Sequence, residues 1–478
     1  MIVTRLERTV ETGAQMSRLS TREALDFAVN PSSIAIFGAS EDPTKLGHVV
    51  VKLLKEGRYS GRIVPINLRG GEILGIRAAR NLSEVVEPID VAVSLVPAEH
   101  MLAVLEQCDA SGVKVVIGVT SGFAESGDAG AGYERNLQTF LAKSTVRLIG
   151  PNCEGIVFPA NNLLLSFSPM FVGLRPGSTA IVSQSGALSG MMANRLAKNG
   201  VGIRTVITTG NESDISASEV LDWLAQDDVC NIILMYLEQI RDADHFVAAA
   251  RAMQGRKKIV INKVGRSSVG QRAAQSHTGA LAGDDRVANG VFTELGILRA
   301  SDTMNAIDST AALSLGKTMA GYNLAVISIA GGLGVEAAEL AEIAKFSVPQ
   351  FRSDLQQKIS KHLPFFGSSG NPVDLTGAIL SRPDDMRRIM DLILADASID
   401  AIIVVVTWAR DLAFTRHIIE TARTTIKPVI VCWTGGVEQT PEALALFREE
   451  SFPIFDSPAR AVSALSAIRR ASTASEFA

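Results

Sequence analysis

The chain has 478 residues, of which 47% are hydrophobic and 20% charged, so it is long enough and apolar enough for about three compact domains. Its 46 Lys and Arg against 50 Asp and Glu give a formal net charge of −4, which argues against nucleic acid as a partner. The four Cys are widely spaced and form no C-x-x-C pair, so neither a disulfide framework nor a zinc site is expected. No apolar run approaches the ~20 residues of a membrane span, and no leader pattern opens the chain. We therefore expect a cytoplasmic protein without a membrane partner.

The first third of the chain alternates short β-branched runs with amphipathic segments of helical length, a pattern typical of parallel sheets. The predicted strands lie at residues 33–38, 62–66, 91–96, 113–119 and 146–150. Five strands separated by helix-length intervals predict a Rossmann-like domain. We place this domain at residues 28–158, after an N-terminal extension of residues 1–27.

The same plan occurs twice more along the chain. Predicted strands lie at residues 178–183, 202–208, 231–236 and 258–263, and a third set begins at 323–328. We predict two flavodoxin-like domains, at residues 159–317 and 318–478, with boundaries in the segments that lack periodicity. The fold class is thus α/β, a Rossmann-like domain followed by two flavodoxin-like parallel-sheet domains. The polar tail at 471–478 is expected to fray.

Ligands of open parallel sheets bind at the carboxyl ends of strands, where the next helices begin. The turn after the first strand carries backbone amides at Gly38, Ala39 and Ser40, and Lys45 follows as a cation for a phosphate. This turn is not a G-x-G-x-x-G fingerprint, so a nicotinamide cofactor is disfavoured. Turns at 183–187 and 330–335 are further candidate anion sites. Alternatively, they only let helix and strand approach closely.

Among the six His, only His277 lies in a segment of small residues after a predicted strand. Lys263, Arg266 and Arg272 occur in the same segment. A neutral imidazole is nucleophilic near neutral pH, and neighbouring cations offset the charge of a phosphoryl group that it accepts. The spacing alone leaves both a catalytic and a structural histidine open.

Eight short motifs occur in a fixed order along the chain. They are PSSIAIFGAS (31–40), GFAE (122–125), GPNC (150–153), SQSGA (183–187), GNESD (210–214), SHTGALAG (276–283), AGG (330–332) and GNPVDL (370–375). In this order they resemble the nucleoside-diphosphate-forming, or ADP-forming, acyl-CoA synthetases, relatives of succinyl-CoA synthetase. The segment with His277 resembles the phosphohistidine loop of that family. The chain is identified as a member that resembles the alpha-type subunit.

The resemblance implies a reaction and a distribution of tasks among the domains. Carboxylate, coenzyme A and ATP would be interconverted with acyl-CoA, ADP and phosphate, through an acyl phosphate and a phosphohistidine. The first domain would bind coenzyme A, the second would carry His277, and the third would supply another helix end to the phosphate site. No segment resembles an ATP-grasp domain. ATP or ADP with Mg²⁺ is therefore expected on a partner chain, an ATP-grasp beta-type subunit, in an α2β2-like assembly. The substrate is a small carboxylic acid that the sequence does not name.

The family's site residues carry over to the matching positions of this chain. The residues implied for coenzyme A are Gly38, Ala39, Ser40, Lys45, Ser94, Val96, Pro97, Asn152 and Cys153. Those implied for phosphate are Ser183, Gln184, Ser185, Gly186, Gly331 and Gly332. Glu238 falls where the family keeps a glutamate beside the active histidine, since a carboxylate on one ring nitrogen fixes the tautomer. No metal ligand is predicted in this chain.

Three positions depart from the pattern of the family. Leu68 replaces a proline, Glu154 replaces a small or apolar residue, and Asp284 and Asp285 follow the histidine motif. Because Glu154 would lie near the thiol end of coenzyme A, it is expected to alter acyl selection. Two other functions stay open, a sensor or scaffold that binds coenzyme A or acyl-CoA, and an ATP-independent acyltransferase. The intact histidine motif counts against the sensor.

Overall fold

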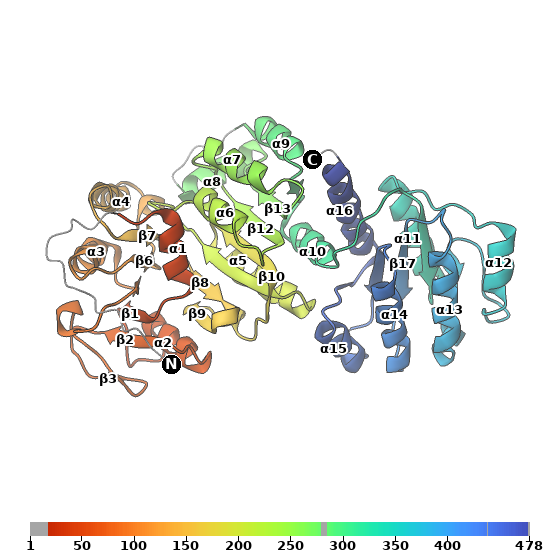
Figure 1. The fold of residues 1–478 in the computed structure, drawn as a ribbon, viewed down its shortest axis with the longest axis horizontal. Coiled ribbons are helices and arrows are strands. Elements are labelled where there is room, and N and C mark those ends of the chain that lie inside the picture. The colour runs from red at the N-terminus through yellow and green to blue at the C-terminus, as the bar shows by residue number, and fades with distance from the viewer. Residues whose placement is uncertain (1–17, 279–283, 437, 477–478) are drawn as a thin grey trace, which may run out of the picture.

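The computed structural model describes residues 18–278, 284–436 and 438–476, which form three α/β units in a row (Figure 1). The second unit lies between the other two in that view. Each unit is built on its own sheet, and helices cover both faces of the parallel strands. The cores are continuous, because one buried cluster joins residues of the first and second units and another joins the second and third.

The first sheet has five parallel strands in the order β2-β1-β5-β6-β7. Their bounds are β1 (Ser33–Phe37), β2 (Arg62–Ile66), β5 (Val91–Ser94), β6 (Val115–Gly118) and β7 (Arg147–Ile149). The helices of this unit are α2 (Leu46–Glu56), α3 (Met101–Ala110) and α4 (Asp128–Leu141), and β3 (Glu72–Ile73) pairs with β4 (Ile76–Arg77) in a small hairpin. The strand order reverses between β1 and β5, which is where ligands bind in doubly wound sheets.

The second sheet has seven strands in the order β14-β13-β12-β10-β11-β8-β9. Their bounds are β8 (Gly155–Phe158), β9 (Leu163–Ser166), β10 (Pro176–Ser183), β11 (Ile203–Thr208), β12 (Ile232–Leu237), β13 (Lys258–Lys263) and β14 (Leu298–Arg299). The helices are α5 (Gly186–Lys198), α6 (Ala217–Ala225), α7 (Ala243–Met253), α8 (Ser268–Thr278), α9 (Asp285–Glu294) and α10 (Thr303–Leu313). The antiparallel strands β8 and β9 extend this sheet, so its first strand begins at Gly155, ahead of the boundary predicted after residue 158.

The third sheet has five parallel strands in the order β16-β15-β17-β18-β19. Their bounds are β15 (Leu324–Ser328), β16 (Val373–Asp374), β17 (Ala401–Val406), β18 (Val429–Trp433) and β19 (Ile454–Phe455). The helices are α11 (Gly331–Ile343), α12 (Ser353–Ser360), α13 (Pro383–Leu394), α14 (Leu412–Thr424), α15 (Pro441–Glu449) and α16 (Pro458–Glu476). The expectation of a frayed tail is wrong, because α16 continues to Glu476. Its buried face packs on α10 and α11 and holds the helix in place.

The parallel strands of all three units follow one order, second-first-third-fourth-fifth, and the predicted α/β fold is confirmed. The second and third units also share a turn. The Ser183 hydroxyl donates to the Ser185 carbonyl at 2.6 Å and accepts from the Ser185 amide at 3.1 Å. Ser328 makes the same two bonds with Ala330, at 2.7 and 3.0 Å. In both units a strand-end serine therefore shapes the start of the following helix, α5 or α11.

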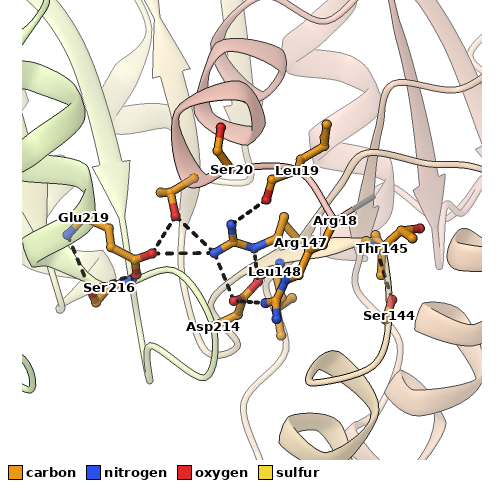
Figure 2. Close-up of polar contacts among 12 residues, drawn as sticks. Arg18, Leu19, Ser20, Ser144, Thr145, Arg147, Leu148, Asp214, Ser216 and Glu219 are labelled. Carbon is orange, nitrogen blue, oxygen red and sulfur yellow. Dashed lines mark hydrogen bonds and ion pairs between the residues drawn. The ribbon is translucent and has the colours of Figure 1, made fainter. Parts of the chain in front are cut away.

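A buried ion-pair network joins the first unit to the second (Figure 2). The Arg147 guanidinium donates through Nε and Nη2 to the two carboxylate oxygens of Asp214, at 2.8 and 3.1 Å, and their side chains are only 7% and 6% exposed. Arg147 also donates to the Leu19 carbonyl at 3.0 Å and to the Thr21 hydroxyl at 3.2 Å. Helix α1 (Thr21–Val29) packs against α6 beside this network. From residue 18 onward, the predicted N-terminal extension is thus part of the junction between the units.

In the ranges that the structure describes, no helix combines the length and the hydropathy needed to cross a membrane.

Candidate active site

The turn after β1 is shaped by two glycines at its closest contacts. Gly38 has φ +82°, and a Cβ there would lie 3.2 Å from the carbonyl carbon and oxygen of Leu95. A Cβ on Gly47 would lie 2.0 Å from the Gly38 oxygen, so only glycine lets α2 approach the turn. Lys45 precedes α2 with an exposed side chain and does not cap the helix. The first amides of α2 therefore face the carboxyl edge, where an anion is favoured.

The residues predicted for coenzyme A in the first unit divide by exposure. Gly38, Lys45 and Pro97 are exposed, and Ser40 and Val96 are half-buried at the same edge. Ala39 and Ser94 are 1% and 0% exposed, because their side chains point into the packed interior. Only their backbone can reach a ligand. The Ser94 hydroxyl is buried without a hydrogen-bond partner among the described residues.

A cavity of about 460 Å³ lies between the first and second units. It is lined by Leu46, Leu95, Val119, Thr120, Ser121, Asn152, Cys153, Glu154, Phe167, Gln184, Ser185, Gly186 and Ala187. Predicted thiol-end residues and predicted phosphate residues, which are about 30 positions apart in the chain, thus share one wall. The cavity also reaches α2 and the loop after β5, beside the turn at Gly38. This volume suits a small ligand.

Cys153 contributes to the cavity wall as a thiol. Its Sγ donates to the Gly118 carbonyl at 3.3 Å, and burial raises the pKa of Cys153 to about 12. A thiol with that pKa stays protonated near neutral pH and is a poor nucleophile. Asn152 has φ +57° and donates through Nδ2 to the Asn211 side chain at 3.2 Å. Cys153 therefore shapes the site, and the reacting thiol has to come from a ligand.

Gln184 is a clamp within the second unit. Its Oε1 accepts from the backbone amides of Glu238 and Gln239 at 2.6 and 3.0 Å, and its Nε2 donates to the Glu212 carboxylate at 2.8 Å and to the Gln239 carbonyl at 3.0 Å. These bonds use all the donors of the side chain, so the amide is not free for phosphate as predicted. The Ser185 amide is likewise engaged by Ser183. The remaining donors of this turn are the first amides of α5, beginning with Gly186.

Glu154 lies beside the start of α5 with 5% of its surface exposed. The Ser189 hydroxyl is 3.1 Å from Glu154 Oε2 and donates to the Gly186 carbonyl at 2.6 Å. A hydroxyl has one hydrogen, so the shorter bond takes it and the proton between Ser189 and Glu154 belongs to the carboxyl. Burial raises the pKa of Glu154 in agreement with this assignment. The cavity is therefore lined by a neutral carboxylic acid.

His277 lies in the last turn of helix α8, whereas the sequence predicted a loop. Its side chain and residues 279–283, the rest of the predicted phosphohistidine loop, lie outside what the structure describes. Helix α8 contacts the short helix η3 (Ala124–Ser126) of the first unit. The backbone at Glu238, which is 6% exposed, is held by Gln184 and by Lys263 Nζ, which donates to its carbonyl at 2.9 Å. The helix with His277 thus reaches the carboxyl edge of the first sheet.

The cations predicted to support His277 have structural partners. Besides Glu238, Lys263 donates to the Val264 carbonyl at 2.8 Å, and burial lowers the pKa of Lys263. Arg266 donates to the carbonyls of Lys263 and Ala300. These two groups are committed to backbone oxygens. Arg272 is exposed on α8.

The acidic pair after the histidine motif starts the next helix. Asp284 caps α9 by accepting from the Arg286 amide at 2.8 Å, and Asp285 pairs with Arg299. This departure from the family's pattern therefore has a local structural reason.

Sequence reasoning missed the role of two motifs that bond to each other across the first two units. The Glu125 carboxylate accepts from the amides of Gly122 and Phe123 at 2.6 and 3.1 Å and from Asn211 Nδ2 at 2.7 Å. Glu134 accepts from Asn211 at 3.2 Å and from the Ser213 hydroxyl at 2.9 Å. These donors lower the pKa of Glu125 although burial opposes them. The resemblance marked both motifs, but no spacing rule joins positions so far apart.

Gly331 and Gly332 begin α11 in the third unit and do not line the cavity described above. A Cβ on Gly331 would lie 3.0 Å from the Asp374 carboxylate, and one on Gly332 would meet open space. The second predicted helix end is therefore accessible but is a separate feature of this chain.

These units and this cavity define a protein of the CoA-ligase class, and family models match each unit in turn. They are described as "CoA binding domain" over residues 32–159, "Succinyl-CoA ligase like flavodoxin domain" over 176–313 and "Ligase-CoA domain" over 324–477. The chain is 36% identical over 463 residues to "Acetate--CoA ligase [ADP-forming] I subunit alpha" of Pyrococcus furiosus, covering 93% of this chain and 97% of that relative. The chain belongs to the ADP-forming acyl-CoA synthetase family and corresponds to its alpha subunit. The predicted family and enzyme class, an acid–thiol ligase, are confirmed.

Two further relatives show the same correspondence. "Acetate--CoA ligase [ADP-forming] I" of Archaeoglobus fulgidus is 31% identical over 445 residues, which are 92% of this chain but 62% of that protein. A solved structure, the dinucleotide forming acetyl-coenzyme A synthetase 1 of Ca. Korarchaeum cryptofilum in complex with phosphate and ADP, matches with a TM-score of 0.84 and 31% identity. That match covers 95% of this chain and 98% of the other.

Proposed function

We propose that this chain is the alpha-type subunit that interconverts carboxylate, coenzyme A and ATP with acyl-CoA, ADP and phosphate. One observation carries the proposal. A single cavity brings Asn152 and Cys153 of the first unit to the amides of Gly186 and Ala187 at the start of α5. A thiol delivered along the first unit would meet an acyl phosphate held at that helix end.

In the proposed reaction the carboxylate oxygen attacks a phosphoryl group on His277, the P–N bond breaks, and an acyl phosphate forms. The thiol sulfur of coenzyme A then attacks the acyl carbon, the C–O bond to phosphate breaks, and the thiol proton passes to the leaving phosphate or to water. The first amides of α2, with Lys45, would hold the phosphates of coenzyme A. The first amides of α5 would stabilise the negative charge on the phosphoryl oxygens.

Glu238 is the proposed positioning residue for His277. It ends β12 next to the Gln184 clamp, which fixes its backbone at 2.6 Å. A carboxylate on one ring nitrogen keeps the lone pair of the other directed at phosphorus. Glu238→Gln should therefore slow formation or loss of the phosphoenzyme without weakening the binding of coenzyme A.

We place the nucleotide site, with Mg²⁺, on a partner of the ATP-grasp type. The chain covers 97% of the relative named as an alpha subunit but 62% of the Archaeoglobus fulgidus relative. The rest of that longer relative has the length expected for the missing nucleotide domain. An α2β2-like assembly is the proposed form of the complete enzyme.

The polar wall at Glu154 bears on the choice of acid. A neutral carboxyl offers a hydrogen bond where an apolar residue offers only packing, so we propose that it favours acyl groups with a polar substituent.

The test combines labelling with exchange. The purified chain, given acyl-CoA and labelled phosphate, should form acyl phosphate and an acid-labile, base-stable label on His277. ADP-dependent turnover should require the ATP-grasp chain. Equal labelling of His277→Ala, or robust ADP formation by the chain alone, would show that the assignment is wrong. Binding of coenzyme A without any exchange or label would favour the sensor.

A further inference from the structure

A second, larger cavity lies between the second and third units. Its volume is about 660 Å³, well within the range of sites for small organic ligands. It opens beside the carboxyl ends of β18 and β19, between α15 and the last turn of α5 (Figure 1). Helix α5 has 13 residues, so this cavity lies about 20 Å from the phosphate-binding end of the same helix. It is therefore separate from the candidate active site.

Unpaired cations gather at one end of this cavity. Arg195 and Lys198 lie one turn apart at the end of α5, and Arg448 lies near the end of α15. All three side chains are exposed, and no acid pairs with any of them in the part of the chain that the structure describes. Cations at a helix C-terminus gain about 0.3–1 kcal/mol from the helix dipole, but like charges one turn apart repel each other by a similar amount. The cluster is thus electrostatically costly unless an anion joins it.

The two helix ends are fixed against each other by a fourth cation. The Arg175 guanidinium donates to the Gly200 carbonyl at 3.2 Å and to the Arg448 carbonyl at 2.5 Å. A Cβ on Gly200 would lie 2.9 Å from the Arg448 oxygen, so the backbones touch directly. The positions of the three unpaired cations are therefore preset by packing and not by a ligand.

The remainder of the wall is mainly apolar. It includes Ile307 of α10, Leu444 and Ala445 of α15, and Ile454 of β19. Arg460 also lines the cavity, but it is neutralised by Asp308 at 2.6 Å and Asp456 at 2.6 Å. The net charge on the wall is therefore positive and comes from the cation cluster.

We infer that this cavity binds an organic phosphate with at least two negative charges and an apolar body, the chemistry of a nucleoside diphosphate. Three cations exceed what a monocarboxylate needs, and the apolar wall has no use for inorganic phosphate alone. Free ADP and the adenosine phosphate part of coenzyme A share this chemistry. The inference does not depend on the proposed function, because it concerns equilibrium binding to the chain without turnover.

The test is calorimetric titration of the full chain with ADP, coenzyme A and inorganic phosphate. Arg195→Glu with Lys198→Glu should lower ADP affinity at least tenfold, and Ala445→Trp, which fills the cavity, should lower it similarly. The matched control is Lys358→Glu with Lys361→Glu on exposed positions at and after α12, which should leave the affinity unchanged.

The coenzyme A titration identifies the source of the ligand. Two binding events in the wild type that become one in the α5 variant support coenzyme A, and one event in both chains leaves ADP as the ligand. The inference is overturned if the wild type binds neither ADP nor a second coenzyme A. It is also overturned if the α5 and control variants behave alike, or if phosphate binds as tightly as ADP. None of these outcomes alters labelling at His277, so failure here and failure of the proposed function are distinguishable.

Discussion

The pair of Arg147 and Asp214 should hold the first two units together. Asp214→Asn keeps the shape of the side chain but leaves the guanidinium, which is 7% exposed, without its bidentate partner. Glu219 lies 3.6 Å from Arg147 and can compensate only in part. Removing one partner of a buried pair costs about 3–5 kcal/mol. Taking the low end because Asn can still accept from the Leu148 amide, we expect about 3 kcal/mol, or roughly a hundredfold faster local opening.

Amide hydrogen exchange measures this opening locally, which suits a chain of several units that need not unfold in one step. Peptides from α1, β7 and the loop before α6 should exchange faster in Asp214→Asn, and peptides from α12 should not. The matched control is Glu420→Gln, which breaks the exposed pair of Arg387 and Glu420 at 3.0 Å and should change stability by less than about 1 kcal/mol. Adding Arg147→Met should restore part of the loss, since the uncompensated charge is then gone. Equal effects of Asp214→Asn and Glu420→Gln would refute the reasoning.

Three more predictions follow from the site. Because burial raises the pKa of Glu154, the folded chain keeps a proton that the unfolded chain releases above a pH of about 4.3, so wild-type stability should fall as pH rises. Glu154→Gln should remove that part of the slope, and urea midpoints at about pH 5 and pH 8 check it; parallel slopes would contradict the neutral carboxyl. Glu154→Leu should shift the ratio of kcat/KM toward unsubstituted acyl-CoA by about tenfold, measured as phosphorolysis of matched acyl and hydroxyacyl thioesters. Gly47→Ala should abolish coenzyme A binding in calorimetry, because its Cβ would lie 2.0 Å from the Gly38 oxygen, whereas Gly132→Ala on α4, with its nearest atom at 3.9 Å, should be neutral or stabilising.

The local pattern of the sequence determined the three sheets and their turns. Runs such as 178–183 and 401–406 are β-branched and apolar along their whole length, as strands buried on both faces must be. A short turn and a helical segment follow each run, so right-handed crossovers produce one parallel order in all three units. Short-range chemistry likewise located the turn at Gly38 and the start of α5. The resemblance then identified the family and drew attention to His277.

The tertiary structure decided which of these features act together. The Gln184 amide appeared to be a phosphate ligand in the sequence, but packing beside β12 uses it to hold the backbone of Glu238. The motif at 210–214 bonds to Glu125 and Arg147 only because two units meet there, and no period or spacing encodes a contact between residues so far apart. The protonation of Glu154 depends on one hydroxyl hydrogen and on burial between units. Sequence patterns report local geometry, whereas burial and charge pairing are set by residues that only the folded chain brings together.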